Sequence, residues 1–224
     1  MRVVVTAGPT YEPLDEVRRL TNISTGRLGS ELVNFLAARG HNVTLLIGQL
    51  ASWRGERHAH RVETFTTTAN LRERLRSLAT EPTDAVFHAA AVSDFGFGKI
   101  WQRSTKGDLT EVKSGKFSTR EGTLLAELVP TPKIIAELRA WYPKATLVGW
   151  KYEVEGDRSG AIKLAEKQIA ESLTDACVVN GTAYGAGFGL VKSGGEFTDL
   201  ADTSKLYAAL QTFICDSQNH SRQD

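Results

Sequence analysis

The first forty residues contain a buried strand and an amphipathic helix, joined by an unusually long polar loop. Residues 2–8 (RVVVTAG) form a short apolar run that ends in glycine, which is typical of a central strand in a parallel sheet. After Gly26, apolar residues recur at i, i+4, i+7 and i+8 from Leu28, the pattern of a helix with one buried face. A dinucleotide-binding fold would bring its glycines close together, but here 17 residues separate Gly8 from Gly26.

The rest of the chain continues this alternation of strands and helices. The predicted strands are residues 2–8, 42–48, 62–67, 84–95, 145–153 and 175–180, and the predicted helices are 26–38, 69–79, 131–142, 157–173 and one from about Thr203. We place residues 84–95 at the sheet centre and Pro132 in the first turn of its helix. This order predicts an α/β fold that is Rossmann-like and doubly wound, with a mainly parallel sheet, in a single domain over residues 1–224.

Two segments interrupt the alternation, and the C-terminus ends it. Residues 96–129 are rich in glycine and lysine and predict a long flap, with a hairpin around TLLAELV. Residues 188–200 predict a late hairpin that turns at Ser193-Gly194-Gly195. The polar tail, about residues 216–224, is expected to fray.

Composition excludes several classes of partner. The 224 residues are 41% apolar, as in globular proteins, and the net charge of +1 gives no basic excess for nucleic acid or a membrane surface. No apolar run approaches the roughly 18 residues that span a bilayer, and no signal peptide precedes the first strand. Two cysteines are too few for a disulfide framework. We therefore expect a cytoplasmic protein in which Cys177 is a buried free thiol.

Two absences argue against a redox Rossmann protein. Such proteins carry Asp or Glu at the end of the second strand to bind ribose, but residues 45–50 read LLIGQL. No tyrosine is followed four residues later by lysine, so the catalytic pair of a short-chain reductase is missing. In SGKFS, Phe117 occupies the Ser/Thr position of a P-loop, which argues against that class of NTPase. A Rossmann-like NAD(P)-binding oxidoreductase nevertheless stays open as an alternative function.

Residues 5–29, VTAGPTYEPLDEVRRLTNISTGRLG, closely resemble the opening of the phosphopantothenoylcysteine synthetase family, also called phosphopantothenate–cysteine ligases. That family carries the pattern T-A-G-x-T-x-E-P-x-D-x-V-R-x-x-x-N-x-S-[ST]-G-x-x-G. The resemblance continues through residues 88–95, 127–135, 147–153 and 175–180, which covers nearly the whole chain. No flavin decarboxylase domain precedes the match, so the chain resembles a stand-alone synthetase that would work with a separate decarboxylase protein.

The resemblance implies a ligase of coenzyme A biosynthesis. In this family the carboxylate of 4′-phosphopantothenate is activated with CTP or ATP, which forms an acyl-nucleotide and releases pyrophosphate. The amine of L-cysteine then displaces the nucleoside monophosphate. The resemblance also implies Mg²⁺ as the cofactor that neutralises the triphosphate, and a homodimer, for which the late hairpin offers a strand edge.

The resemblance further assigns roles to individual residues. Asn22 and Lys116 match the catalytic asparagine and the flap lysine, although Lys113 is close enough to be the flap lysine instead. The expected nucleotide-binding residues are Gly8, Ser24, Thr25, Gly26, Ala89, Ala90, Ala91, Asp94, Thr131, Pro132, Lys133, Ile134, Trp150, Lys151 and Lys167. The expected substrate-binding residues are Arg18 and Asn180, and no protein ligand to a metal is assigned. The loop that carries Asn22 is thus expected to shape the acyl-nucleotide site, where its amide can donate to a carbonyl or phosphoryl oxygen.

Several positions depart from the bacterial pattern of this family. Lys133 stands where an acid is common, Trp150 stands in place of phenylalanine, and Lys151 is more similar to the ATP-using eukaryotic pattern. Lys167 lies near one of two lysines expected to face phosphate, while Glu171 lies near the other. These departures leave the choice between CTP and ATP open. They also keep a third possibility, a nucleotide-binding module without catalytic activity.

Overall fold

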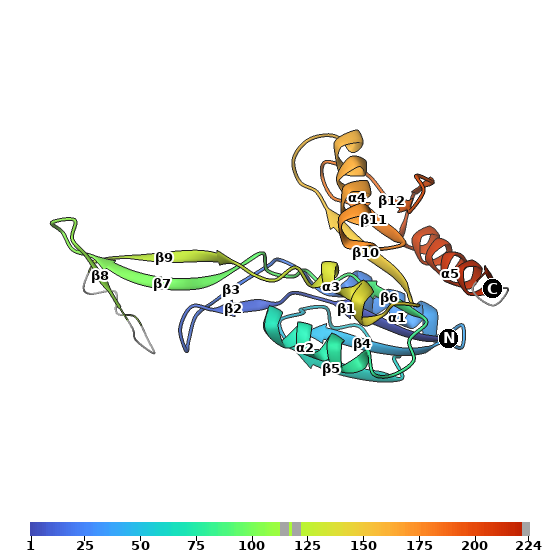
Figure 1. The fold of residues 1–224 in the computed structure, drawn as a ribbon, viewed down its shortest axis with the longest axis horizontal. Helices are drawn as coiled ribbons and strands as arrows, with labels where there is room; N and C mark the ends of the chain where they lie inside the picture. Colours follow the sequence, from blue (N-terminus) through green and yellow to red (C-terminus); the bar gives the residue numbers. More distant parts are fainter. Residues whose placement is uncertain (113–116, 118–121, 221–224) are drawn as a thin grey trace.

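The computed structural model describes residues 1–112, 117 and 122–220, and its centre is an eight-stranded sheet (Figure 1). The strands are ordered β13-β12-β11-β10-β6-β1-β4-β5. Their bounds are β1 (Arg2–Ala7), β4 (Asn42–Gly48), β5 (Arg61–Phe65), β6 (Ala85–His88), β10 (Thr146–Tyr152), β11 (Ala176–Asn180), β12 (Phe188–Lys192) and β13 (Phe197–Leu200). All neighbours from β5 to β11 pair in parallel, while β12 and β13 pair antiparallel as the predicted late hairpin. The predicted mainly parallel α/β sheet is confirmed.

Helices cover both faces of this sheet. Their bounds are α1 (Arg27–Ala37), α2 (Thr68–Leu78), α3 (Ile134–Trp141), α4 (Arg158–Ser172) and α5 (Thr203–His220). Successive strand side chains point to opposite faces, so Val5 and Phe87 join the core under α1 and α5, while Val4 and Val86 join the core under α2 and α3. A third apolar cluster, around Val179, packs under α4. Burial on both faces explains why the central strands are short continuous apolar runs.

The order of the strands places a switch of direction beside β1. From β1 the chain moves to β4 and β5 on one side, and then crosses to β6, β10 and β11 on the other. In open α/β sheets, ligands bind in the crevice outside the carboxyl ends of the strands, at such a switch point. The strand order therefore predicts a ligand site at the loops that follow β1 and β6.

Two hairpins form an arm that extends well away from the sheet (Figure 1). The arm consists of β2 (Tyr11–Pro13), β3 (Arg19–Thr21), β7 (Phe95–Arg103), β8 (Leu109–Glu111) and β9 (Thr123–Pro130). β7 pairs with both β8 and β9, and this region coincides with the predicted flap and its hairpin. The β2–β3 hairpin lies within the long loop between Gly8 and Gly26, and it leads directly to Asn22.

A carboxylate joins the two hairpins of the arm. Asp15 accepts hydrogen bonds from Nε and Nη2 of Arg18, at 3.0 and 2.5 Å, and from the backbone nitrogen of Phe117 at 3.3 Å. Arg18 in turn donates to the carbonyl oxygen of Phe117 at 2.9 Å. The Arg18 guanidinium holds the pKa of Asp15 well below its usual range. We call these three residues the arm latch.

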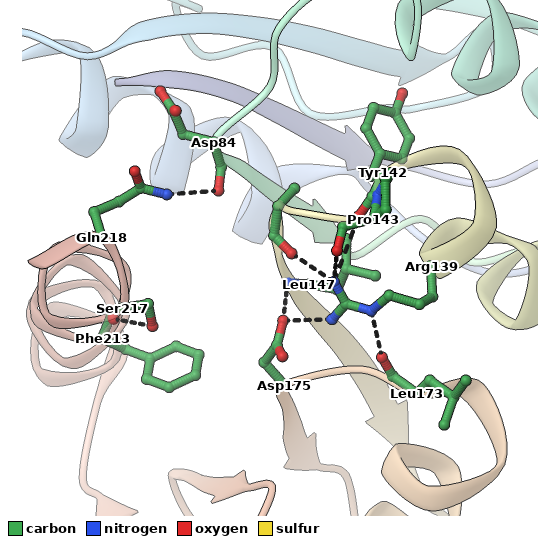
Figure 2. A network of polar contacts seen from close by, with 11 residues as sticks. Asp84, Arg139, Tyr142, Pro143, Leu147, Leu173, Asp175, Phe213, Ser217 and Gln218 are labelled. Atoms are coloured by element: carbon green, nitrogen blue, oxygen red, sulfur yellow. Dashed lines mark hydrogen bonds and ion pairs between the residues drawn. The ribbon is translucent and has the colours of Figure 1, made fainter. Parts of the chain in front are cut away.

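Arg139 anchors α3 to the strands that carry the other side of the crevice (Figure 2). Its guanidinium donates to the carbonyl oxygen of Leu173 at 3.0 Å, to that of Ala145 at 2.9 Å and to Asp175 at 2.8 Å. Asp175 also accepts from the backbone nitrogen of Leu147 at 2.6 Å. One side chain thus fixes the ends of α3 and α4 against β10 and β11.

The structure corrects four details of the prediction. The strand at the sheet centre ends at His88 rather than Phe95, because beyond His88 its pairing with β1 is reduced to an isolated bridge between Pro9 and Ala91. Pro132 precedes the N-cap Lys133 and so lies outside α3. The C-terminal helix extends into the predicted polar tail, since α5 runs to His220 and Gln218 donates to the carbonyl oxygen of Asp84 at 3.4 Å, while residues 221–224 lie outside the described residues. The strands β2 and β3 were not predicted, since three residues are too few for a recognisable alternation.

Candidate functional site

A cavity of about 620 Å³ opens at the carboxyl ends of β6, β10 and β11. It lies at the switch point that the strand order defines. Most of the predicted site residues line it: Asn22, Ser24, Ala89, Ala90, Ala91, Asp94, Thr131, Pro132, Lys133, Ile134, Trp150, Lys151 and Asn180. Five segments far apart in the sequence therefore meet at one place.

The loop after β6 is tied to the end of β1 by its backbone. The nitrogen of Ala89 donates to the carbonyl oxygen of Thr6 at 3.2 Å, and that of Ala90 donates to Thr6 Oγ1 at 3.1 Å. The nitrogen of Ala91 donates to the carbonyl oxygen of Gly8 at 3.0 Å. These N–H groups are committed, so the three alanines supply room beside a ligand rather than backbone donors to it.

Asn22 fixes the same loop from the other side. Its amide nitrogen donates to the carbonyl oxygens of Ala91 and Val92, at 3.2 and 3.0 Å. A carboxamide has two N–H hydrogens and one acceptor oxygen, so both hydrogens have partners within the chain. The amide that we expect to donate to a ligand holds the wall of the cavity here, and its contact with a ligand stays a prediction.

The predicted glycines lie behind the cavity and make its shape possible. Gly26 is the N-cap of α1 with φ 75°, and no side chain caps the helix at that position. A Cβ on Gly26 would lie 3.4 Å from the Cα of Gly8, so the turn after β1 and the start of α1 approach closely. Thr25 Oγ1 accepts from the backbone nitrogen of Arg27 at 3.2 Å. Among the described residues, Gly8, Thr25 and Gly26 support the site without lining the cavity.

The charged side chains of the cavity are few. Asp94 is the carboxylate among its described lining residues, and Lys133 and Lys151 are the cations. Lys151 pairs with Glu153 at 3.0 Å, whereas Lys133 forms the N-cap of α3 without a side-chain capping bond. Within residues 1–112, 117 and 122–220, no group of three or more His, Cys, Asp or Glu side chains could hold a metal ion.

Two further predicted residues, Arg18 and Lys167, do not line the cavity. Arg18 belongs to the arm latch, so its guanidinium binds protein atoms rather than the cavity. Lys167 is two-thirds exposed and lies 3.7 Å from Glu171. Its neighbour Gln168 lines the cavity instead, because it follows Ala161 and Ala165 on the inner stripe of α4. Lys116, and its alternative Lys113, lie outside the described residues.

The structure adds several lining residues that the sequence analysis did not single out, and His88 and Gln168 are two of them. His88 ends β6, and its Nδ1 lies 3.0 Å from Thr6 Oγ1, a contact between residues 82 positions apart. Burial lowers the pKa of His88 to about 4. Gln168 donates to Sγ of Cys177 at 3.2 Å, and Cys177 is a buried free thiol as predicted, with a pKa that burial raises to about 12. Of these two residues, only Gln168 could have been found from the sequence, through its position on the inner stripe of α4.

A doubly wound sheet with a cavity of about 620 Å³ at its switch point defines a Rossmann-like α/β protein with room for a nucleotide-sized ligand. The family model described as the DNA/pantothenate metabolism flavoprotein C-terminal domain matches residues 1–209, and the chain belongs to this family. No described helix is long and apolar enough to cross a membrane.

Individual proteins of known sequence or structure agree with this assignment. The coenzyme A biosynthesis bifunctional protein CoaBC of Thermococcus kodakarensis is 35% identical over 179 residues, which are 80% of this chain and 41% of the relative. The chain thus spans less than half the length of that curated relative. The DNA/pantothenate metabolism flavoprotein from Streptococcus pneumoniae shares the fold, with a TM-score of 0.84, 23% identity and coverage of 96% and 99% of the two chains. The Cab2 mutant H337A in complex with phosphopantothenate-cysteine has a TM-score of 0.75 at 18% identity, over 99% of this chain and 88% of that one.

Proposed function

We propose that the chain is a phosphopantothenate–cysteine ligase of coenzyme A biosynthesis. One observation supports this most: Asn22, the loop after β6, the segment before α3 and the end of β10 surround one cavity. These are the segments that resemble the synthetase family most closely. Relatives named as bifunctional proteins of coenzyme A biosynthesis support the same function.

In the first step, the carboxylate of 4′-phosphopantothenate attacks the α-phosphorus of a nucleoside triphosphate, and pyrophosphate leaves. Gly26 has no side chain to cap α1 and Thr25 takes the N–H of Arg27, so the N–H groups of Leu28 and Gly29 are the ones that suit a phosphate. Mg²⁺ would arrive with the triphosphate, and Asp94 is the carboxylate available in the cavity to hold it. Bound there, the ion would neutralise the triphosphate oxygens.

In the second step, the amine of L-cysteine forms the C–N bond as the C–O bond to the nucleoside monophosphate breaks. The ammonium proton leaves to water. We assign Asn22 to this step, because its amide holds Ala91 and Val92 in place beside the acyl-nucleotide. The flap lysine, Lys116 or Lys113, is proposed to supply positive charge to the leaving phosphate.

The partners of the reaction follow from the same proposal. The co-substrate is CTP or ATP, and Trp150, Lys151 and Asn180 are proposed to contact it or the acyl substrate. The domain over residues 1–224 would act as a homodimer in the cytoplasm, supplied with phosphopantothenate, and a decarboxylase would consume the product.

Pyrophosphate release tests the proposal. The protein is incubated with phosphopantothenate and either CTP or ATP, with and without cysteine. Activation should release one pyrophosphate per active site without cysteine, and sustained turnover should require cysteine. Absence of pyrophosphate with both nucleotides, from protein that binds them, would contradict the ligase and favour a nucleotide-binding module. Oxidation of a nicotinamide cofactor instead would favour the oxidoreductase.

A further inference from the structure

A row of polar residues crosses the sheet where the cavity meets α3 and α4. The strand registers align Thr6 of β1 with His88 of β6, His88 with Gly149 of β10, and Gly149 with Cys177 of β11. The four residues therefore lie side by side at one level of the sheet, on one face. Two residues earlier, the same face of β1, β6 and β10 carries only apolar side chains: Val4, Val86 and Leu147.

Gln168 of α4 fills the space above the glycine in this row. A Cβ on Gly149 would lie 2.5 Å from Gln168 Nε2, so only glycine leaves room for the carboxamide there. One amide hydrogen is used by Cys177 Sγ at 3.2 Å. The second hydrogen and the carbonyl oxygen have no partner among the described residues, and the side chain lines the cavity.

His88 is held in the same row by Thr6. Its Nδ1 lies 3.0 Å from Thr6 Oγ1, which also accepts from the nitrogen of Ala90 at 3.1 Å. Because burial lowers the pKa of His88 to about 4, the ring is uncharged at neutral pH. Its Nε2 has no partner within the described part of the chain. The row thus combines donors and acceptors and carries no charge.

We propose that His88 and Gln168 are specificity-determining residues that bind an uncharged hydrogen-bonding group of a substrate, either the edge of the nucleobase or an amide of phosphopantothenate. The inference rests on the proposed function, and it adds two residues to the site. A phosphate or carboxylate would be bound more strongly by cationic partners. A neutral imidazole and a carboxamide suit a group that presents donors and acceptors together.

The test compares His88→Leu and Gln168→Leu with Lys163→Leu, a control at an exposed position of the same helix. KM is measured for the nucleotide and for phosphopantothenate separately. Both row variants should raise the KM of the same substrate by about three- to tenfold, the effect of one neutral hydrogen bond, while Lys163→Leu changes neither. A higher KM for the nucleotide assigns the nucleobase, and a higher KM for phosphopantothenate assigns the amide.

Binding measurements keep the test independent of turnover. The rise in melting temperature is recorded with nucleotide alone, with phosphopantothenate alone and with inorganic pyrophosphate. Unchanged binding and KM in both variants would overturn the proposal, as would effects on two different substrates or an equal loss of pyrophosphate binding. A wild-type protein that binds nucleotide but releases no pyrophosphate would contradict the proposed ligase alone. If either leucine variant does not fold, His88→Phe and Gln168→Met replace it.

Discussion

The carboxyl edge of the sheet and the arm differ in how far their apolar side chains are buried. Behind the cavity, Val5 and Phe87 are fully buried, and each has a partner on a covering helix. On the arm, Leu109 and Leu128 remain 56% and 50% exposed. The apolar side chains behind the cavity are thus covered within the chain, whereas the arm presents apolar surface that nothing described in this chain covers. The arm, more than the late hairpin, is the surface we expect a second copy to use.

The largest expected effect is on catalysis in the cavity at the carboxyl edge of the sheet, and it leaves the arm unchanged. Asn22→Asp replaces two N–H donors by an oxygen beside the carbonyl oxygens of Ala91 and Val92. Amide formation should slow by roughly 10²–10³, the range for loss of one well-placed donor, while acyl-nucleotide still forms and accumulates. Mass spectrometry of a quenched single turnover detects it.

A matched control separates this effect from loop damage. Asn34 also clamps a loop, with its amide on Glu56 and its oxygen on the nitrogen of His58, but it lies outside the cavity. Asn34→Asp should keep the wild-type rate, and melting curves should show both variants folded. A folded Asn22→Asp protein that forms product at the wild-type rate would remove Asn22 from the mechanism.

The next effect is on the free energy of unfolding, through His88 at the carboxyl edge of the sheet. Burial favours neutral His88, so its contribution to the free energy of unfolding is complete above the ordinary histidine pKa of about 6.5 and is lost as the pH falls towards its folded pKa of about 4. That difference corresponds to about 3 kcal/mol. Denaturant unfolding between pH 7 and pH 4 should therefore show a steeper loss for the wild type than for His88→Leu. Equal pH slopes would mean that His88 is readily protonated in the folded protein.

The preference between CTP and ATP is a smaller effect, and it concerns only the cavity at the carboxyl edge of the sheet. We expect kcat/KM for CTP and ATP to differ by at least tenfold, about 1.4 kcal/mol, because the wrong base leaves polar groups of the cavity unpaired. Steady-state kinetics with each nucleotide measures the ratio. Equal kcat/KM values for CTP and ATP would show that the cavity does not distinguish the two bases.

The smallest expected effect lies in the arm. Asp15→Asn weakens the arm latch, because the charged partner of Arg18 and of the Phe117 nitrogen is lost. Amide hydrogen exchange in β7 and β9 should become about tenfold faster, while β1 and β6 stay protected. Glu31→Gln, which breaks the exposed pair with Arg27, serves as the control. Equal acceleration in β1 would show that arm and sheet unfold together.

These two regions also differ in what sequence reasoning recovers. β4 was predicted to the residue, since an apolar run between polar turns identifies a buried parallel strand. The hairpin β2–β3 was missed because each of its strands has three residues and depends on contacts with the rest of the arm. Local pattern identifies elements that are buried on both faces, but not those held by distant partners.

The site shows the same limit. Motif residues such as Asn22 and Asp94 were located by resemblance, and both line the cavity. Lys167 is not among the described residues that line the cavity, because one helical residue corresponds to a rotation of about 100°, which brings Gln168 inward instead. The contact of His88 with Thr6 spans 82 positions, and it depends on strand register that no local pattern contains.

One measurement tests most directly whether the cavity forms an acyl-nucleotide. Phosphopantothenate is labelled with ¹⁸O in its carboxylate and converted with cysteine and the preferred nucleotide, and the products are analysed by mass spectrometry. The carboxylate oxygen that attacks the α-phosphorus stays with that phosphorus when the amine breaks the C–O bond. We therefore predict one ¹⁸O in the nucleoside monophosphate and none in pyrophosphate. Label in orthophosphate, or none in the monophosphate, would contradict the acyl-nucleotide mechanism.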